Sequence, residues 1–149
     1  MAFTAPGGVA MNRRALLRIL LPLAVMGVIF FFSAQPAGGH HAWWVIAVRK
    51  LGHITGYALL TAAWWWALRG VTGRPLLIAV CIAFAYACTD EFHQTFVSGR
   101  TGTPVDVAID SIGMAIAALL INLRRKTSDR RTEIDPEALG LRSSPARSP

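Results

Sequence analysis

Four apolar runs, each about long enough to cross a lipid bilayer, limit the folds open to this chain. They cover about residues 15–34, 52–68, 76–92 and 105–123, and short polar stretches separate them. A transmembrane helix needs about 17–25 predominantly apolar residues. The composition agrees, because 15% charged residues is well below the roughly 25% of a typical soluble domain. The sequence therefore predicts an all-α membrane protein, a bundle of four transmembrane helices.

Lysine and arginine concentrate on one side of this predicted bundle. Most of the fifteen lie in or beside residues 1–14, in the turn at 69–75 and in residues 124–149, whereas the other side has Arg49, Lys50 and Arg100. Basic loops stay on the cytoplasmic side, so we expect both termini in the cytoplasm. We interpret the net charge of +7 as membrane topology and expect no nucleic-acid partner, since basic and aromatic residues do not alternate as in a base-stacking surface.

The two ends of the chain receive separate predictions. Residues 1–14 form a short cytoplasmic segment, and the apolar run that follows is a span by length. Its basic start and the small residues of Ser33–Ala37 are also compatible with a cleaved signal peptide. Residues 124–149 are polar, rich in Ser, Pro and Arg, and without apolar periodicity, which predicts a disordered cytoplasmic tail.

Polar residues at the ends of three predicted spans conflict with their apolar surroundings. Each group keeps to one helix face, with spacings of three and four residues in the second and fourth spans. In a four-span topology all three groups reach the outer half of the membrane. We therefore predict one shared outward-facing polar site, with candidates Lys50, His53, Tyr57, Asp90, Glu91, His93, Gln94, Arg100, Asp106 and Asp110.

The charge of this predicted site needs balancing. Four carboxylates face Lys50 and Arg100, and each ionised group at bilayer depth costs about 2.5–3.5 kcal/mol on insertion scales. Shared protons, a protonated His53 or His93, or a bound cation would supply the remainder. The alternative is a set of separate hydrogen bonds between helices. The sequence assigns no metal ligand and no cofactor, because adjacent His40 and His41 in a glycine-rich stretch are insufficient evidence for a metal site.

The order and spacing of these residues resemble the VanZ-like family, membrane proteins named after the teicoplanin-resistance protein of glycopeptide resistance clusters. The resemblance runs from about Phe30 to Asn122. Its carriers are Ser33-Ala34-Gln35-Pro36, then Lys50, His53 and Tyr57, then Asp90-Glu91 with Gln94, Phe96 and Arg100, and finally Asp106, Asp110 and Gly113. The family often has Asn at the position of Asp110. The resemblance implies a multi-pass protein of the bacterial plasma membrane linked to glycopeptide resistance.

Three functions are compatible with the sequence. The first is a non-enzymatic envelope protein whose polar site binds a lipid headgroup, a lipid-linked cell-wall precursor or the glycopeptide. The second is a membrane hydrolase or transferase in which Asp90, Glu91 or Asp106 acts beside His93. The third is a proton-coupled transporter. We favour the first, because no nucleophile motif, zinc-helix motif or phosphate-binding loop supports catalysis, and four spans are few for a transporter that is not a homo-oligomer.

Overall fold

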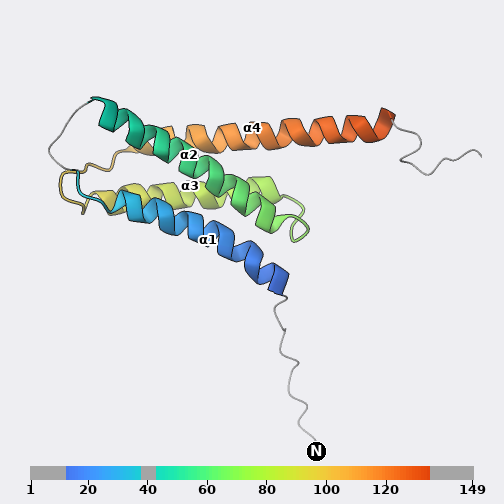
Figure 1. Ribbon diagram of the computed structural model, residues 1–149, viewed down its shortest axis with the longest axis horizontal. Helices are drawn as coiled ribbons and strands as arrows, with labels where there is room; N and C mark the ends of the chain where they lie inside the picture. Colours follow the sequence, from blue (N-terminus) through green and yellow to red (C-terminus); the bar gives the residue numbers. More distant parts are fainter. Residues whose placement is uncertain (1–12, 38–42, 135–149) are drawn as a thin grey trace, which may run out of the picture.

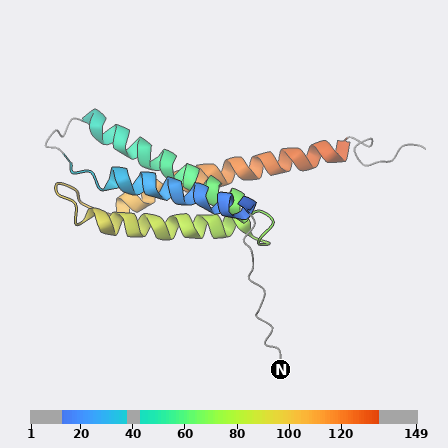
Figure 2. The same ribbon diagram turned by 60° about the horizontal axis from the view of Figure 1, so that its bottom comes forward.

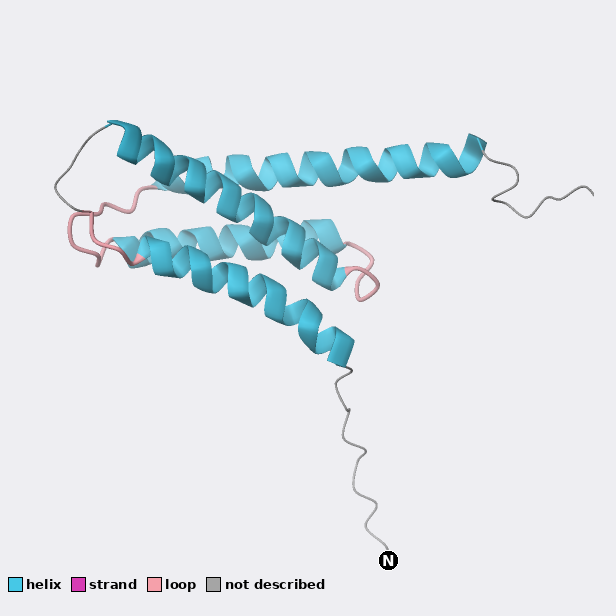
Figure 3. Cartoon of the chain, viewed as in Figure 1, coloured by secondary structure: helices cyan, strands magenta, loops and turns pink. Residues whose placement is uncertain are grey.

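The computed structural model of the chain describes residues 13–37 and 43–134. These residues form four helices, α1 (Arg13–Ser33), α2 (Trp43–Leu68), α3 (Pro75–Gln94) and α4 (Pro104–Ile134). Within the described ranges there is no strand, and an isolated bridge joins Arg69 to Thr72 in the α2–α3 turn (Figure 3). The predicted all-helical fold is confirmed.

Successive helices run in opposite directions, so the two ends of the bundle have different parts (Figure 1). At one end, which we call the loop end, the last turns of α1 and α3 meet the first turns of α2 and α4, together with segments 34–37 and 95–103. At the other end, the turn end, segment 69–74 joins α2 to α3. Figure 2 shows the same arrangement from another side, with α4 extending beyond the other three helices.

Two helix boundaries differ from those predicted. α2 begins at Trp43, not at residue 52, because residues 43–51 contain no Gly or Pro, and the helix breakers lie before them. Arg49 and Lys50 therefore lie on the helix. α4 continues beyond residue 123 to Ile134, since Arg, Lys and Glu favour helix and the next proline is Pro136. The predicted disorder from residue 124 is wrong as far as Ile134, and residues 135–149 lie outside the described ranges.

Small side chains bring the helices together. Ala79, Ala83 and Ala87 follow one another at four-residue spacing on α3, and all three are fully buried. On α4, a Cβ at Gly113 would collide with the Ile54 carbonyl oxygen of α2. Small residues at such contacts allow close approach of helix backbones, as is common between membrane helices.

Large apolar side chains cover the outside of all four helices. Phe32 on α1 is 63% exposed, Leu59 on α2 58%, Leu77 on α3 54% and Leu119 on α4 59%. Exposed apolar surface of this extent is typical of contact with lipid or with another protein.

By length and hydropathy, two of the described helical stretches can span a membrane, Pro75–Gln94 and Pro104–Arg131. The apolar part of α1, Leu17–Ser33, is shorter. α2 is not among these stretches, and it contains Arg49, Lys50 and His53. Hydropathy therefore supports two spans and does not by itself confirm four.

Candidate functional site

The buried face of α3 changes from alanine to polar residues as it reaches the loop end. Ala83 and Ala87 are followed on that face by Glu91 at the same spacing, with Asp90 and Gln94 beside it. These three polar residues are only 2%, 5% and 7% exposed for Asp90, Glu91 and Gln94 respectively. Buried carboxylates and amides require hydrogen-bond partners, so the neighbouring helices must supply them.

Asp90 and Glu91 receive these hydrogen bonds from neutral groups. The Ser33 hydroxyl of α1 donates to Asp90 Oδ2 at 2.7 Å. The Gln94 amide donates to the same Asp90 oxygen at 3.2 Å and to Glu91 Oε1 at 2.9 Å. Glu91 Oε2 accepts from the Thr103 backbone N–H at 3.3 Å. Neither carboxylate forms an ion pair with a lysine, arginine or histidine of the described chain.

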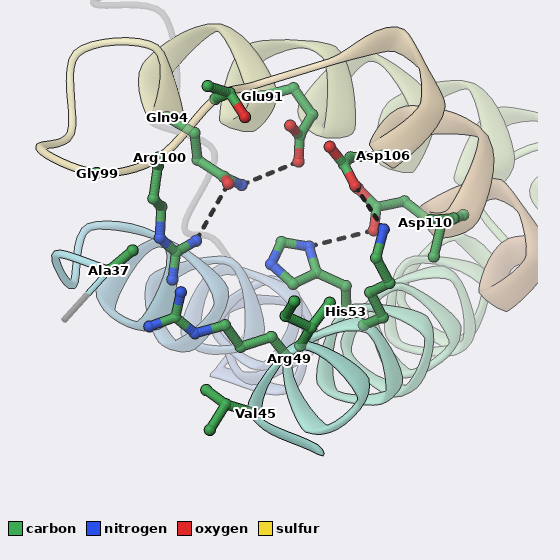
Figure 4. Close-up of a pocket in the computed structure, with 14 residues that line it drawn as sticks. Ala37, Val45, Arg49, His53, Glu91, Gln94, Gly99, Arg100, Asp106 and Asp110 are labelled. Atoms are coloured by element: carbon green, nitrogen blue, oxygen red, sulfur yellow. Dashed lines mark hydrogen bonds and ion pairs between the residues drawn. The ribbon is translucent and has the colours of Figure 1, made fainter. Parts of the chain in front are cut away.

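Two further carboxylates join α4 to α2. Lys50 Nζ lies 3.0 Å from Asp106 Oδ1, and both side chains are partly exposed. His53 Nδ1 lies 3.2 Å from Asp110 Oδ1, one helical turn deeper, where Asp110 is only 1% exposed (Figure 4). The predicted polar faces of α2 and α4 therefore lie against one another, joined by two residue pairs one helical turn apart.

Thr103 caps the first turn of α4 and holds Asp106 in place. Its hydroxyl donates to Asp106 Oδ2 at 2.7 Å and accepts from the Asp106 backbone N–H at 3.3 Å. This reciprocal cap, with Pro104 at the first helical position, is a common helix start. The positive end of the helix dipole also favours the Asp106 carboxylate.

Arg100 fastens segment 95–103 to the end of α1. Its Nε donates to the Gln35 carbonyl oxygen at 3.0 Å, and its Nη2 donates to the Phe32 carbonyl oxygen at 2.9 Å. Its Nη1 donates to Gln94 Oε1 at 3.1 Å. Burial lowers the pKa of the Arg100 guanidinium from its usual value, and the positive charge of the nearby Arg49 lowers it further.

Glycines permit the close approach of this segment to its neighbours. Gly99 has φ of +74°, and a Cβ there would come within 2.9 Å of the Ala37 carbonyl oxygen. A Cβ at Gly102 would collide with the Glu91 carbonyl oxygen. Backbone therefore lies directly against backbone at both positions, which only glycine allows.

These contacts leave a cavity of about 340 Å³ at the loop end (Figure 4). Seven of the ten predicted site residues line it: Lys50, His53, Glu91, Gln94, Arg100, Asp106 and Asp110. The remaining lining residues include Arg49, Gly99 and Thr101. Helices α2, α3 and α4, together with Arg100 of segment 95–103, thus bring charged groups of both signs to one cavity.

The other three predicted residues do not line the cavity. Asp90 lies behind it and is joined to it through Gln94. Tyr57 is fully buried next to the apolar cluster, and its hydroxyl has no partner among the described residues. His93 faces α1, where its ring centroid lies 4.6 Å from that of Phe30.

Three contributors were absent from the predicted set. Arg49 precedes the predicted span at 52–68, so the sequence does not indicate that it lies on α2 beside Lys50. Thr103 could have been found from the capping pattern Thr-Pro-Val-Asp at 103–106. Ser33 gives no such signal, because a serine at the end of an apolar run is common and its partner lies 57 positions away.

The fold and the site together define a small helical protein with a charged cavity at one end of its bundle, and its two long apolar helices indicate a membrane protein. A family model described as VanZ/LLP1 matches residues 18–125. The chain therefore belongs to the VanZ/LLP1 family, as its motifs predicted. No curated protein and no solved structure matches it.

Proposed function

We propose that the chain crosses the bacterial plasma membrane four times, with both termini in the cytoplasm and the loop end on the outer side. The four antiparallel helices, their exposed apolar side chains and the smaller number of basic residues at the loop end support this topology. In this proposal α1 remains in the protein and is not removed as a signal peptide. Its contribution to the site supports this, because the Ser33 hydroxyl binds Asp90 and the Phe32 carbonyl oxygen binds Arg100.

Reporter fusions test this topology. Fusions after Gly39 and Gly102 should report the outer side, and fusions after Gly73 and Gly140 the cytoplasm. A cytoplasmic signal from the Gly102 fusion would exclude an outward-facing cavity, whatever its ligand.

The cavity in this proposal binds the anionic headgroup of an envelope lipid or a lipid-linked cell-wall precursor. One observation carries this proposal of an anion site: Arg49 and Arg100 both line the cavity, and their guanidinium groups lie next to one another (Figure 4). Arg49 has no hydrogen bond or ion pair to a described residue, and the two positive charges oppose one another. An anion between them would relieve this repulsion. A phosphate can accept two hydrogen bonds from the Arg49 guanidinium, together with the Nη hydrogens of Arg100 that its three existing hydrogen bonds leave free.

The rest of the cavity fits the uncharged part of such a headgroup. Lys50 is already paired with Asp106 and Arg100 also binds Gln94 and the end of α1, so Arg49 is the cavity cation with no described partner. Carboxylate oxygens of Glu91 and Asp106 line the same space and can accept hydrogen bonds from sugar or glycerol hydroxyls. Through such binding, and in view of its family, we propose that the protein contributes to glycopeptide tolerance, including tolerance of teicoplanin.

Lipid binding to the purified chain tests the ligand. In nanodiscs, the wild type should enrich phosphatidylglycerol or a polyprenyl phosphate over phosphatidylcholine, as measured by native mass spectrometry. Arg49→Gln and Arg100→Gln should each reduce this enrichment by at least about fivefold, equivalent to about 1 kcal/mol.

Arg69→Gln at the turn end is the matched control and should keep the enrichment. Equal enrichment in all four proteins would reject the anion site. The same variants, compared at equal membrane levels, should lose teicoplanin tolerance in the same order.

A membrane hydrolase or transferase is the second candidate. It is favoured by the close grouping of His53, Asp90 and Glu91, whose ligand-type atoms lie within 4.8 Å of one another. Release of a soluble phosphate-bearing product from a lipid-linked precursor by the purified protein would support it over binding alone. A proton-coupled transporter has no comparable observation in its favour.

A further inference from the structure

His53, Asp90 and Glu91 lie where α2 and α3 meet, with His53 and Glu91 on the cavity wall and Asp90 behind it. Each offers one ligand-type atom, a ring nitrogen or a carboxylate oxygen, and these atoms all lie within 4.8 Å of one another. Zinc lies about 2.0–2.2 Å from nitrogen and oxygen ligands, so ligand atoms on one ion are at most about 4.4 Å apart. The three ligand atoms are therefore close to, but wider than, the spacing of ligands on one ion, and the side chains would rotate toward one another to bind it.

One residue of this group, Asp90, has a buried oxygen without a partner. Asp90 is 2% exposed, and its Oδ2 accepts hydrogen bonds from Ser33 and Gln94. Its Oδ1 has no hydrogen-bond partner in the described chain. An ionised carboxylate oxygen without a partner in a buried position is costly, and a cation is one of the few groups that satisfy it.

The hydrogen bond from His53 to Asp110 prepares the imidazole for a cation. With Nδ1 donating to Asp110 Oδ1, Nε2 keeps its lone pair. A carboxylate behind a ligating histidine fixes the ring orientation and raises its basicity, as in many metal sites. Asp110 would thus act through His53, without itself contacting the ion.

The local charge also favours a cation. Around Asp90 and Glu91 the hydrogen-bond donors are a hydroxyl, an amide and a backbone N–H, all neutral. Of the cations that line the cavity, Lys50 pairs with Asp106, Arg100 binds Gln94 and the end of α1, and Arg49 forms no ion pair with either carboxylate. A divalent ion supplies the two positive charges that balance the two carboxylates.

We infer that His53, Asp90 and Glu91 form a binding site for a divalent transition-metal ion, with Asp110 as its supporting carboxylate. One imidazole and two carboxylates suit Zn²⁺ or Mn²⁺ better than Mg²⁺, which prefers oxygen ligands alone. Three protein ligands leave a coordination position for water or for an anionic group of a bound molecule. The inference goes beyond headgroup binding and does not depend on it.

Metal titration of the full-length protein tests the site. The chain is purified in detergent with a tag that contains no histidine, stripped with a chelator, and titrated with Zn²⁺ alone and with Mn²⁺ alone. We expect one ion per chain. His53→Asn, Asp90→Asn and Glu91→Gln should each weaken binding more than about tenfold, and Asp110→Asn should weaken it by about tenfold, in the range of supporting residues.

Two variants are matched controls. Asp106→Asn removes a carboxylate from the same cavity but not from the group, and His40→Ala/His41→Ala removes the two other histidines closest in the sequence. Both should change the affinity by less than about threefold. Absence of stoichiometric metal, equal weakening by Asp106→Asn, or loss of binding in the His40/His41 variant would each overturn the site.

Further measurements distinguish loss of metal binding from loss of folding, and metal binding from headgroup binding. Circular dichroism and gel filtration identify any variant that fails to fold, and the remaining ligand variants then carry the comparison. Because titration in detergent contains no lipid, it succeeds or fails independently of headgroup binding. Lipid enrichment by the chelator-treated protein tests headgroup binding without metal.

Discussion

The loop end and the turn end of the bundle both carry arginines, but these arginines have different kinds of partner. At the loop end, Arg100 binds two carbonyl oxygens of the α1 end, 65 and 68 positions away in the sequence. At the turn end, Arg69 lies over the ring of Trp65, one helical turn before it, at 4.4 Å from the centroid. Arg18 lies over Trp66 at 5.6 Å.

The difference teaches how charge is accommodated at the two ends. At the loop end, charged groups are partly or fully buried, so carbonyls, carboxylates and an amide from other elements must satisfy them. At the turn end, the guanidinium groups of Arg69 and Arg18 lie over tryptophan faces, and the contact of Arg69 with Trp65 is local to one helical turn. Substitutions at the loop end should therefore disturb the tertiary structure more than equivalent substitutions at the turn end.

The largest difference is expected between two loop glycines. Gly102→Ala places a methyl group against the Glu91 carbonyl oxygen and should destabilise the protein by about 1–3 kcal/mol, the usual cost of inserting a methyl into a tight contact. Gly73→Ala at the turn end meets no atom within 4 Å and should be nearly neutral. Unfolding in mixed micelles, followed by circular dichroism, measures both, and equal effects would contradict the comparison.

The arginines themselves provide the next test. Arg100→Ala removes three hydrogen bonds, two of them exposed, and should cost about 1–2 kcal/mol. Arg69→Ala removes one contact with an aromatic face and should cost about 0.5–1 kcal/mol. The same unfolding assay compares them, and a larger loss for Arg69→Ala would reverse the proposed order of the two ends.

A smaller effect distinguishes two residues of the loop end that form an ion pair from two residues that only share the cavity. Lys50→Met and Asp106→Asn should couple by about 0.5–1 kcal/mol in a double-mutant cycle, because their side chains are 43% and 31% exposed. Arg100→Gln with Asp106→Asn is the control pair. No hydrogen bond or ion pair joins these two residues in the described structure, so their effects should add within about 0.5 kcal/mol. If the control pair coupled more strongly than Lys50 and Asp106, the main charge partner of Asp106 would be Arg100 and not Lys50.

The smallest effect is expected at the far end of α4. Residues 122–131 are exposed, so truncation after Lys126 removes no buried surface that the structure describes. Stability should change by less than about 0.5 kcal/mol, as is usual for surface changes. A marked loss of folded protein in membranes, at unchanged synthesis, would show that this segment has a tertiary role.

Much of the fold could be predicted from the sequence because its signals are local. Run length indicated four helices, spacing indicated which residues share a face, and the order of Lys50, His53, Asp90, Glu91 and Arg100 indicated the family. The helix ends were less accurate, because residues 43–51 and 124–134 carry no breaker yet are less apolar than the spans they extend. Hydropathy marks only the most apolar part of a helix, whereas the helix itself also includes the more polar turns at either end.

The sequence by itself determined that polar faces of α2, α3 and α4 exist, and chain direction placed them at one end. Only the tertiary structure decided their partners: Lys50 with Asp106, His53 with Asp110, and Ser33 with Asp90. It also directed His93 toward Phe30 and enclosed Tyr57. The physical reason is that periodicity fixes where a side chain lies around its own helix. The rotation and depth of one helix against another depend on contacts such as Gly113 with Ile54, which join positions far apart in the chain.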